Sequence, residues 1–188
     1  SNSNGMPEVI SGGNFHGQIL SIIGDNLAVC THEIASISER RINQVLDPQW
    51  SGQKAFLAND EGLESGLMIV QYVAAAVIAE LSLLSNPVST TNVPVSMGKE
   101  DHVSMGATAA FRTLKASKLL SSVISSELIC SCQALDNISE RPSDSVSKIH
   151  EWVRKYVSKL DSDRSTTEDT EIIAEKILTT EFSGIFRK

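Results

Sequence analysis

The sequence predicts an all-α protein, a bundle of long helices that carries a small helical appendix at its C-terminal end. Apolar residues recur every three or four positions over most of the 188 residues, which is the spacing of one helix face. A helix over residues 102–135 would be about 50 Å long, whereas a compact domain of this size has a radius of gyration of about 16 Å. A helix that long needs other chains or further segments to cover its apolar side. The pattern therefore predicts a helical oligomer.

The first helix is predicted over residues 18–46, and Pro48 ends it. A loop is expected over residues 47–64. The apolar positions of the helix follow one another in steps of three and four, which marks a single helix face. These positions are Ile19, Ile22, Ile23, Leu27, Cys30, Ile34, Ile37 and Ile42.

The second helix is predicted over residues 65–84 and is apolar on nearly every side. Such a helix is expected to be surrounded by protein. The alanines at 74–76 allow neighbouring helices to come close. Gln71 and Glu80 interrupt the apolar run, and no charged flanks or aromatic belt frame it, so a buried core helix is favoured over a membrane span.

Residues 85–101 cannot be helical because Pro87, Pro94 and Gly98 interrupt them, and short extended pieces are expected near residues 8–10 and 93–95. The long helix over 102–135 follows. The appendix is expected to contain helices over 143–160 and 168–179, the latter capped by Thr166 or Thr167.

Composition excludes several classes of function. The chain has 16 Lys and Arg against 23 Asp and Glu, a net charge of −7, which argues against a nucleic-acid partner. Its three cysteines are expected to be buried thiols in a reducing cytoplasm. Cysteine and histidine do not occur at metal-ligand spacing, so no metal site is expected.

The segment SGGNFHG at 11–17 is the first candidate for chemistry. Its three glycines allow unusual backbone angles and close approach of another group, and they frame Phe15 and His16 just before a helix. The alternative is an ordinary loop that leads into the helix, with Phe15 as an apolar staple.

The segment GKEDHVSM at 98–105 is the second candidate. Four ionisable residues, 99–102, precede the long helix. Asp101 is explained as an N-terminal helix cap, and Glu100 has the same alternative. In a partly desolvated cleft, however, the carboxylate of Glu100 can act as a general base. His32 and His150 are expected to be structural or exposed.

Several strings in a fixed order carry a family resemblance. Besides the two candidate segments, they are DNLAV at 25–29, SERRI at 38–42, AFL at 55–57, SGLMIVQYVAAAVIAE at 65–80, QALD at 133–136 and the D-x-D-R at 161–164. Together they resemble the histidine ammonia-lyases of the aromatic amino acid lyase family.

The resemblance implies an all-α long-helix bundle that works as a cytoplasmic homotetramer and converts L-histidine to trans-urocanate and ammonia. It implies no external cofactor, because the family makes its methylidene-imidazolone electrophile from an internal Ala-Ser-Gly. It also divides the chain into an active-site loop over residues 1–18, long central-bundle helices over 19–136 and a C-terminal helical appendix over 137–188.

Three residues are assigned roles by the resemblance. Phe15 matches the aromatic residue that lines the pocket beside the electrophile, and Glu100 matches the acidic residue assigned to substrate binding or acid–base work. His16 and Glu100 stand where related phenylalanine and tyrosine lyases tend to have Gln, so a polar substrate such as histidine is favoured. Lys99 stands where the lyases usually have Gln, which leaves a lyase or aminomutase for another aromatic amino acid as an alternative.

The triplet Ala-Ser-Gly does not occur in the 188 residues. Family members are much longer and resemble this sequence over their last part only. The chain is therefore expected to be the C-terminal part of a larger lyase and to be inactive alone. A non-catalytic helical assembly module is the alternative.

Overall fold

The computed structural model describes residues 5, 7–10 and 12–186 of the protein. Their secondary structure is helical, with two isolated bridges, Glu61 with Glu64 and Val95 with Glu100, in place of any strand. The all-α prediction is confirmed. The helices are α1 (Gln18–Leu46), α2 (Pro48–Ser51), η1 (Ala55–Leu57), α3 (Met68–Leu84), η2 (Ser96–Gly98), α4 (Gly106–Asp136), α5 (Asp144–Arg154), α6 (Thr167–Ile177) and α7 (Thr180–Gly184).

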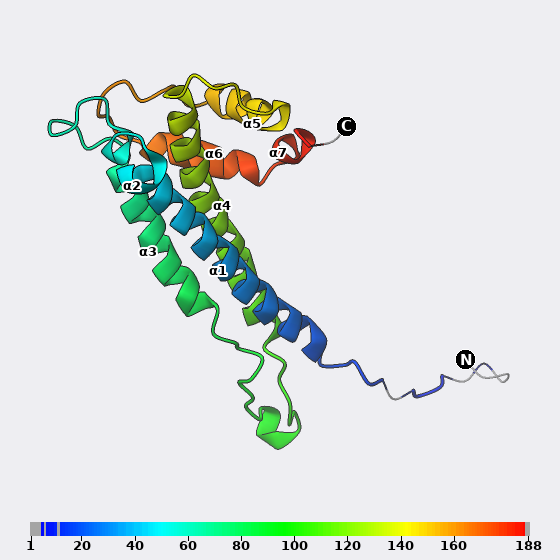
Figure 1. Cartoon of the computed structure of the whole chain (residues 1–188). Helices are drawn as coiled ribbons and strands as arrows, with labels where there is room; N and C mark the ends of the chain where they lie inside the picture. The colour runs from blue at the N-terminus through cyan, green and yellow to red at the C-terminus, as the bar shows by residue number, and fades with distance from the viewer. Residues whose placement is uncertain (1–4, 6, 11, 187–188) are drawn as a thin grey trace.

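Three long helices, α1, α3 and α4, lie side by side as an elongated bundle (Figure 1). The short helices α5, α6 and α7 gather at one end of it. At the opposite end, α1 begins and the segment 85–105 connects α3 to α4 (Figure 1). We call this the loop end. Both candidate segments from the sequence lie there.

Helix α1 has the predicted bounds, but the face that it buries is not the predicted one. Against α4 and α3 it buries mainly small side chains, among them Ala28 and Ala35, together with Ile42. Of the eight predicted apolar positions only Ile42 is buried. Small residues let the helix axes approach closely, so the larger aliphatic side chains are left on the other side of α1. The exposed ones among the predicted positions are Ile19, Ile22, Ile23, Leu27, Ile34 and Ile37.

Helix α3 begins at Met68, three residues later than predicted. Gly66 has a left-handed backbone (φ 54°), and a Cβ there would collide with the carbonyl oxygen of Phe56. The prediction that protein surrounds α3 is not met within the described chain. Val70, Ala74 and Leu81 are buried. Its other sides expose Ile69, Tyr72, Val73 and Leu83.

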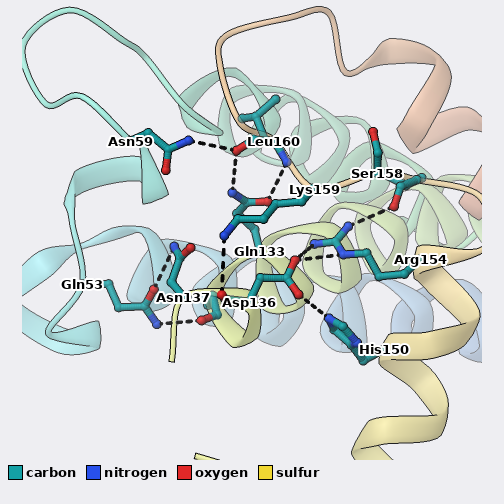
Figure 2. A network of polar contacts seen from close by, with 12 residues as sticks. Gln53, Asn59, Gln133, Asp136, Asn137, His150, Arg154, Ser158, Lys159 and Leu160 are labelled. Carbon is teal, nitrogen blue, oxygen red and sulfur yellow. Dashed lines mark hydrogen bonds and ion pairs between the residues drawn. The ribbon is translucent and has the colours of Figure 1, made fainter. Parts of the chain in front are cut away.

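A polar network fixes the appendix to the end of α4 (Figure 2). The side-chain amide of Gln133, which is buried, donates to Leu160 O at 2.9 Å and accepts from Leu160 N–H at 3.0 Å. The carboxylate of Asp136 binds His150 Nε2 at 2.6 Å and Arg154 Nη2 at 2.6 Å. The QALD string therefore has a structural part in holding the appendix, and His150 is structural, as predicted.

The loop between α5 and α6 also clamps the loop before α3. Asn59 Nδ2 donates to Asp161 O at 2.7 Å, and the Asp163 carboxylate accepts from Ser65 N–H and Gly66 N–H, both at 2.8 Å. The D-x-D-R string thus stabilises the start of α3.

The helices of the appendix and the loop 47–64 differ in detail from the predictions. Ser143 caps α5, which ends at Arg154 rather than near 160. Thr166 occupies the N-cap position of α6 as predicted, but its side chain makes no capping hydrogen bond. Helix α7 was not predicted, nor were α2 and η1 within the loop 47–64.

The cysteines are all unpaired, and two of the three match the prediction. Cys130 and Cys132 are buried, and burial raises the pKa of the Cys132 thiol to about 11. Cys30 is exposed, which corrects its assignment as a buried thiol. It lies on the side of α1 that faces away from α3 and α4. In the described part of the chain, no helix combines the length and the apolar character that crossing a membrane requires.

Candidate functional site at the loop end

The first candidate segment forms a turn directly before α1. Phe15 is 81% exposed, and His16 is exposed as well. Their rings meet edge to face, with centroids 5.2 Å apart. Ser11, the first residue of the segment, lies outside the described residues. The structure therefore presents Phe15 outward from the chain at the loop end.

The second candidate segment is one side of a small backbone ribbon. Val95 and Glu100 exchange two backbone hydrogen bonds, of 2.9 and 3.2 Å. Asn92 joins the two sides of the ribbon further from its turn. Its Oδ1 accepts from Val103 N–H at 2.9 Å, and its Nδ2 donates to Asp101 O at 3.3 Å. This ribbon holds the backbone of Glu100 in place.

The ribbon also rules out the helix-capping explanation. Helix α4 starts at Gly106, not at 102, and its N-cap residue is Met105 in a left-handed conformation (φ 56°). Asp101 and Glu100 lie several residues upstream, so neither caps the helix. The capping interpretation of Asp101 is wrong because Asn92 engages the backbone of residues 101 and 103 outside any helix.

The carboxylate of Glu100 is half-buried. Within the described residues it forms no hydrogen bond or ion pair, neither with Phe15 or His16 nor with its neighbour Lys99, whose side chain is exposed. Phe15 and His16 therefore share one end of the bundle with Glu100, but neither forms a hydrogen bond or ion pair with its carboxylate.

His102 is the residue that joins the two segments. Its ring meets that of His16 edge to face at 5.0 Å, and its Nε2 lies 2.9 Å from Gln18 Oε1. Gln18 is the first residue of α1 and also donates from Nε2 to Ser89 O at 3.2 Å. One side chain thus connects the start of α1 with both halves of the segment 85–105.

Asp25, which lies further along α1 than Gln18, binds the same segment. It is buried, and its Oδ2 accepts from Ser89 N–H at 2.8 Å. Burial alone would raise the pKa of Asp25. Hydrogen bonds from Ser89 and Val88, with the charge of Arg112, outweigh burial and hold that pKa below its ordinary value. The carboxylate is therefore charged at neutral pH.

A groove of about 780 Å³ runs along α1 and α4 from His16. Its lining is largely apolar, with Leu20, Ile23, Leu27 and Leu114 beside the polar Ser104 and Thr113. Among the residues that the structure describes, no three His, Cys, Asp or Glu side chains come together in the way that a metal ion needs.

Sequence matches establish the family. Residues 3–155 match the family described as Aromatic amino acid lyase. The chain is 46% identical over 157 residues to the histidine ammonia-lyase of Deinococcus radiodurans, a match that covers 84% of this chain and 30% of that protein. The chain belongs to the aromatic amino acid lyase family.

Solved structures of this lyase family have the same fold. The histidine ammonia-lyase of Trypanosoma cruzi matches 97% of this chain and 36% of its own with a TM-score of 0.89 at 33% identity. The tyrosine aminomutase of Streptomyces globisporus matches 96% and 35% with a TM-score of 0.90 at 32% identity. The chain spans about a third of the length of the relatives it matches.

The lyase-family strings predicted Phe15, His16 and Glu100 as site residues, but they did not predict the side chains that hold the two segments in place. Asp25 lies within one such string, DNLAV, without a recognisable role in the sequence alone. Gln18 and Asn92 carried no signal, because a single amide residue has no characteristic pattern. Their partners lie between 9 and 84 residues away in the chain.

Proposed function

We propose that this chain supplies part of the active site of a histidine ammonia-lyase, which eliminates ammonia from L-histidine to give trans-urocanate. In this proposal Glu100 contacts the substrate and takes part in its binding or in proton transfer, and Phe15 and His16 line the pocket. A carboxylate suits the ammonium or imidazole of histidine, because hydrogen bonds between charged partners are strong.

The observation that carries the proposal is the meeting of two segments far apart in sequence. The His16 and His102 rings lie 5.0 Å apart, so SGGNFHG and GKEDHVSM come together at the loop end. The backbone of Glu100 is fixed two residues before His102 by its pairing with Val95. Among the residues that the structure describes, neither a helix cap nor an ion pair accounts for the Glu100 carboxylate.

The reaction also needs the methylidene-imidazolone of the family, the electrophile that would activate the amino acid. The 188 residues hold no Ala-Ser-Gly from which to form it. The chain does offer groups that suit such a site, an exposed aromatic ring at Phe15 and a half-buried carboxylate at Glu100. Their part is to line the pocket and to hold the substrate or a proton, while the electrophile is supplied by residues outside these 188.

The proposal is tested in a hybrid enzyme, in which this chain replaces the stretch of the Deinococcus radiodurans relative that matches it. The hybrid is expected to form urocanate from L-histidine, measured by absorbance. Glu100→Gln keeps the shape and removes the charge, so turnover should fall by about 10²–10⁴-fold with an unchanged melting temperature.

Glu140→Gln is the matched control, since Glu140 is exposed and lies between α4 and α5, which meet at the end of the bundle opposite the loop end. This variant should keep normal turnover. Normal turnover of the Glu100→Gln hybrid would contradict the proposal and would leave the chain with an assembly role.

A second candidate function is a lyase or aminomutase for tyrosine or phenylalanine. It is favoured by the tyrosine aminomutase of Streptomyces globisporus, whose TM-score of 0.90 is as high as the 0.89 of the Trypanosoma cruzi histidine ammonia-lyase to within 0.01. The same hybrid given each amino acid separates the candidates. Faster turnover of tyrosine or phenylalanine than of histidine would favour the second one.

Assembly and location are further parts of the proposal. The aliphatic side chains exposed along α1 support a homo-oligomer, and the family resemblance makes it a tetramer. Three unpaired cysteines are consistent with a reducing cytoplasm.

A further inference from the structure

Gln18 makes hydrogen bonds through both the NH₂ group and the oxygen of its side-chain amide. Nε2 donates to Ser89 O at 3.2 Å, and Oε1 lies 2.9 Å from His102 Nε2. A carbonyl oxygen such as Ser89 O only accepts, so the NH₂ group of the amide must point to it. This contact fixes the orientation of the amide.

The fixed amide determines which nitrogen of His102 carries a proton. Because Oε1 of Gln18 only accepts, His102 Nε2 must donate. In the neutral imidazole the proton is therefore on Nε2, and Nδ1 is left as an acceptor. The ring is also held in orientation, since its other neighbour, His16, packs against it edge to face with centroids 5.0 Å apart.

The backbone N–H and C=O of Ser89 are both held by side chains of α1. Asp25 Oδ2 accepts from its N–H at 2.8 Å, and Gln18 Nε2 donates to its C=O. Two side chains of α1, one of them a buried carboxylate, thus fix the segment that leaves α3. Through His102, Gln18 also holds the segment that enters α4.

We propose that His102, held by Gln18 in its Nε2–H form, is a positioning residue that fixes the Glu100 ribbon relative to Phe15 and His16. The inference rests on the proposed function, in which these three residues face the substrate. Glu100 is only two residues from His102, and helix α4 does not begin until Gly106. Without the Gln18–His102 bond, residues 100–105 keep the ribbon contacts to Asn92 and Val95 but lose their side-chain hydrogen bond to α1.

The hydrogen bond is tested directly in the 188-residue chain labelled with ¹⁵N-histidine, which has four histidines to assign. A slowly exchanging Nε2 proton is expected for His102 and should disappear in Gln18→Leu. Gln71→Leu is the matched control, because Gln71 is a half-buried amide whose Nε2 donates to Asn43 Oδ1 at 2.8 Å, where α3 begins and α1 ends, away from the loop end. It should keep the signal. A His102 ring protonated on Nδ1, or a signal that is indifferent to Gln18→Leu, would overturn the inference.

Kinetics of the hybrid enzyme test the positioning role. His102→Phe keeps a ring against His16 but removes the donor, and kcat/KM should fall by about 10- to 100-fold, because small misplacements of reacting groups are costly. His102→Gln places an N–H at nearly the reach of Nε2 and should recover most of the loss. A residue with a merely structural role would lower the melting temperature in both variants without this rescue.

The outcomes separate the two proposals. If Glu100→Gln abolishes turnover while His102→Phe keeps normal kcat/KM, the positioning role is wrong and the proposed function stands. If Glu100→Gln keeps normal turnover, the proposed function fails, and the positioning role fails with it even where the Nε2 proton depends on Gln18.

Discussion

Gly24 of α1 and Ala109 of α4 lie so close that a Cβ added to Gly24 would be 3.0 Å from the Cβ of Ala109 and 3.3 Å from its carbonyl carbon. Thr113 Oγ1 donates to Gly24 O at 2.8 Å across the same contact. Gly24 lies between Gln18 and Asp25 in α1. The close crossing therefore sets how the loop end of α1 meets the segment 85–105.

Substitution of Gly24 by valine should open this crossing. The added methyl groups meet the Ala109 backbone, which cannot move aside, so the free energy of unfolding should fall by about 1–3 kcal/mol in urea titrations. The double variant Gly24→Val with Ala109→Gly should be less destabilised than the sum of the two single changes. Strict additivity would show that these two residues do not share a contact.

Acid should weaken the protein through Asp25. Because its pKa in the folded chain lies below the ordinary 3.8, the stabilisation from its charge is fully present above about pH 4 and is lost as the pH falls through the lower folded pKa. At pH 7 the Asp25→Asn variant should be less stable than the unchanged protein. When the pH falls below 4, the variant should lose less stability than the unchanged protein does. Urea unfolding at both pH values measures this. Asp161→Asn, at an exposed carboxylate, should follow the unchanged protein at both values; equal pH slopes for Asp25→Asn and the unchanged protein would contradict the prediction.

The sequence was sufficient for the long helices and for the two segments that meet at the loop end. It misassigned the buried face of α1, because small residues such as Ala28 and Ala35 recur with the same helical spacing as the larger aliphatic ones. Which set packs inward depends on how closely α4 approaches. The start of α4 at Gly106 rather than at 102 could not be predicted from the sequence pattern, because it follows from the side chain of Asn92 and the left-handed backbone of Met105.

Gln133→Leu should loosen the appendix. The buried amide of Gln133 exchanges two hydrogen bonds with the Leu160 backbone. A leucine side chain at position 133 would leave the N–H of Leu160 without its partner. The free energy of unfolding should fall by about 1–3 kcal/mol, because a buried polar group without a hydrogen-bond partner is costly. Gln71→Leu removes one half-buried amide contact and should cost about 1 kcal/mol. Equal melting temperatures for the two variants would argue against the special role of Gln133.

The exposed aliphatic side of α1 should make the chain associate in solution. Leu27 and Ile34 lie seven residues apart on that side and are 51% and 50% exposed. Replacing both with aspartate should shift sedimentation toward the monomer, because charges oppose burial of that face. Ile172→Asp, at a 41% exposed position on α6, is the control and should leave the assembly unchanged. A clean monomer of the unchanged chain at all concentrations would contradict the prediction.

The isolated 188-residue chain should produce no urocanate from L-histidine. Elimination needs an electrophile to activate the amino acid, and the chain has no Ala-Ser-Gly to form one. Glu100 alone moves a proton or binds an ammonium but leaves the carbon–nitrogen bond unactivated. Absorbance of the chain incubated with histidine should stay at the level of a protein-free blank, while the hybrid enzyme shows a steady rise. A rate in the isolated chain that matches the hybrid and disappears in Glu100→Gln would mean that these residues activate the substrate by another route.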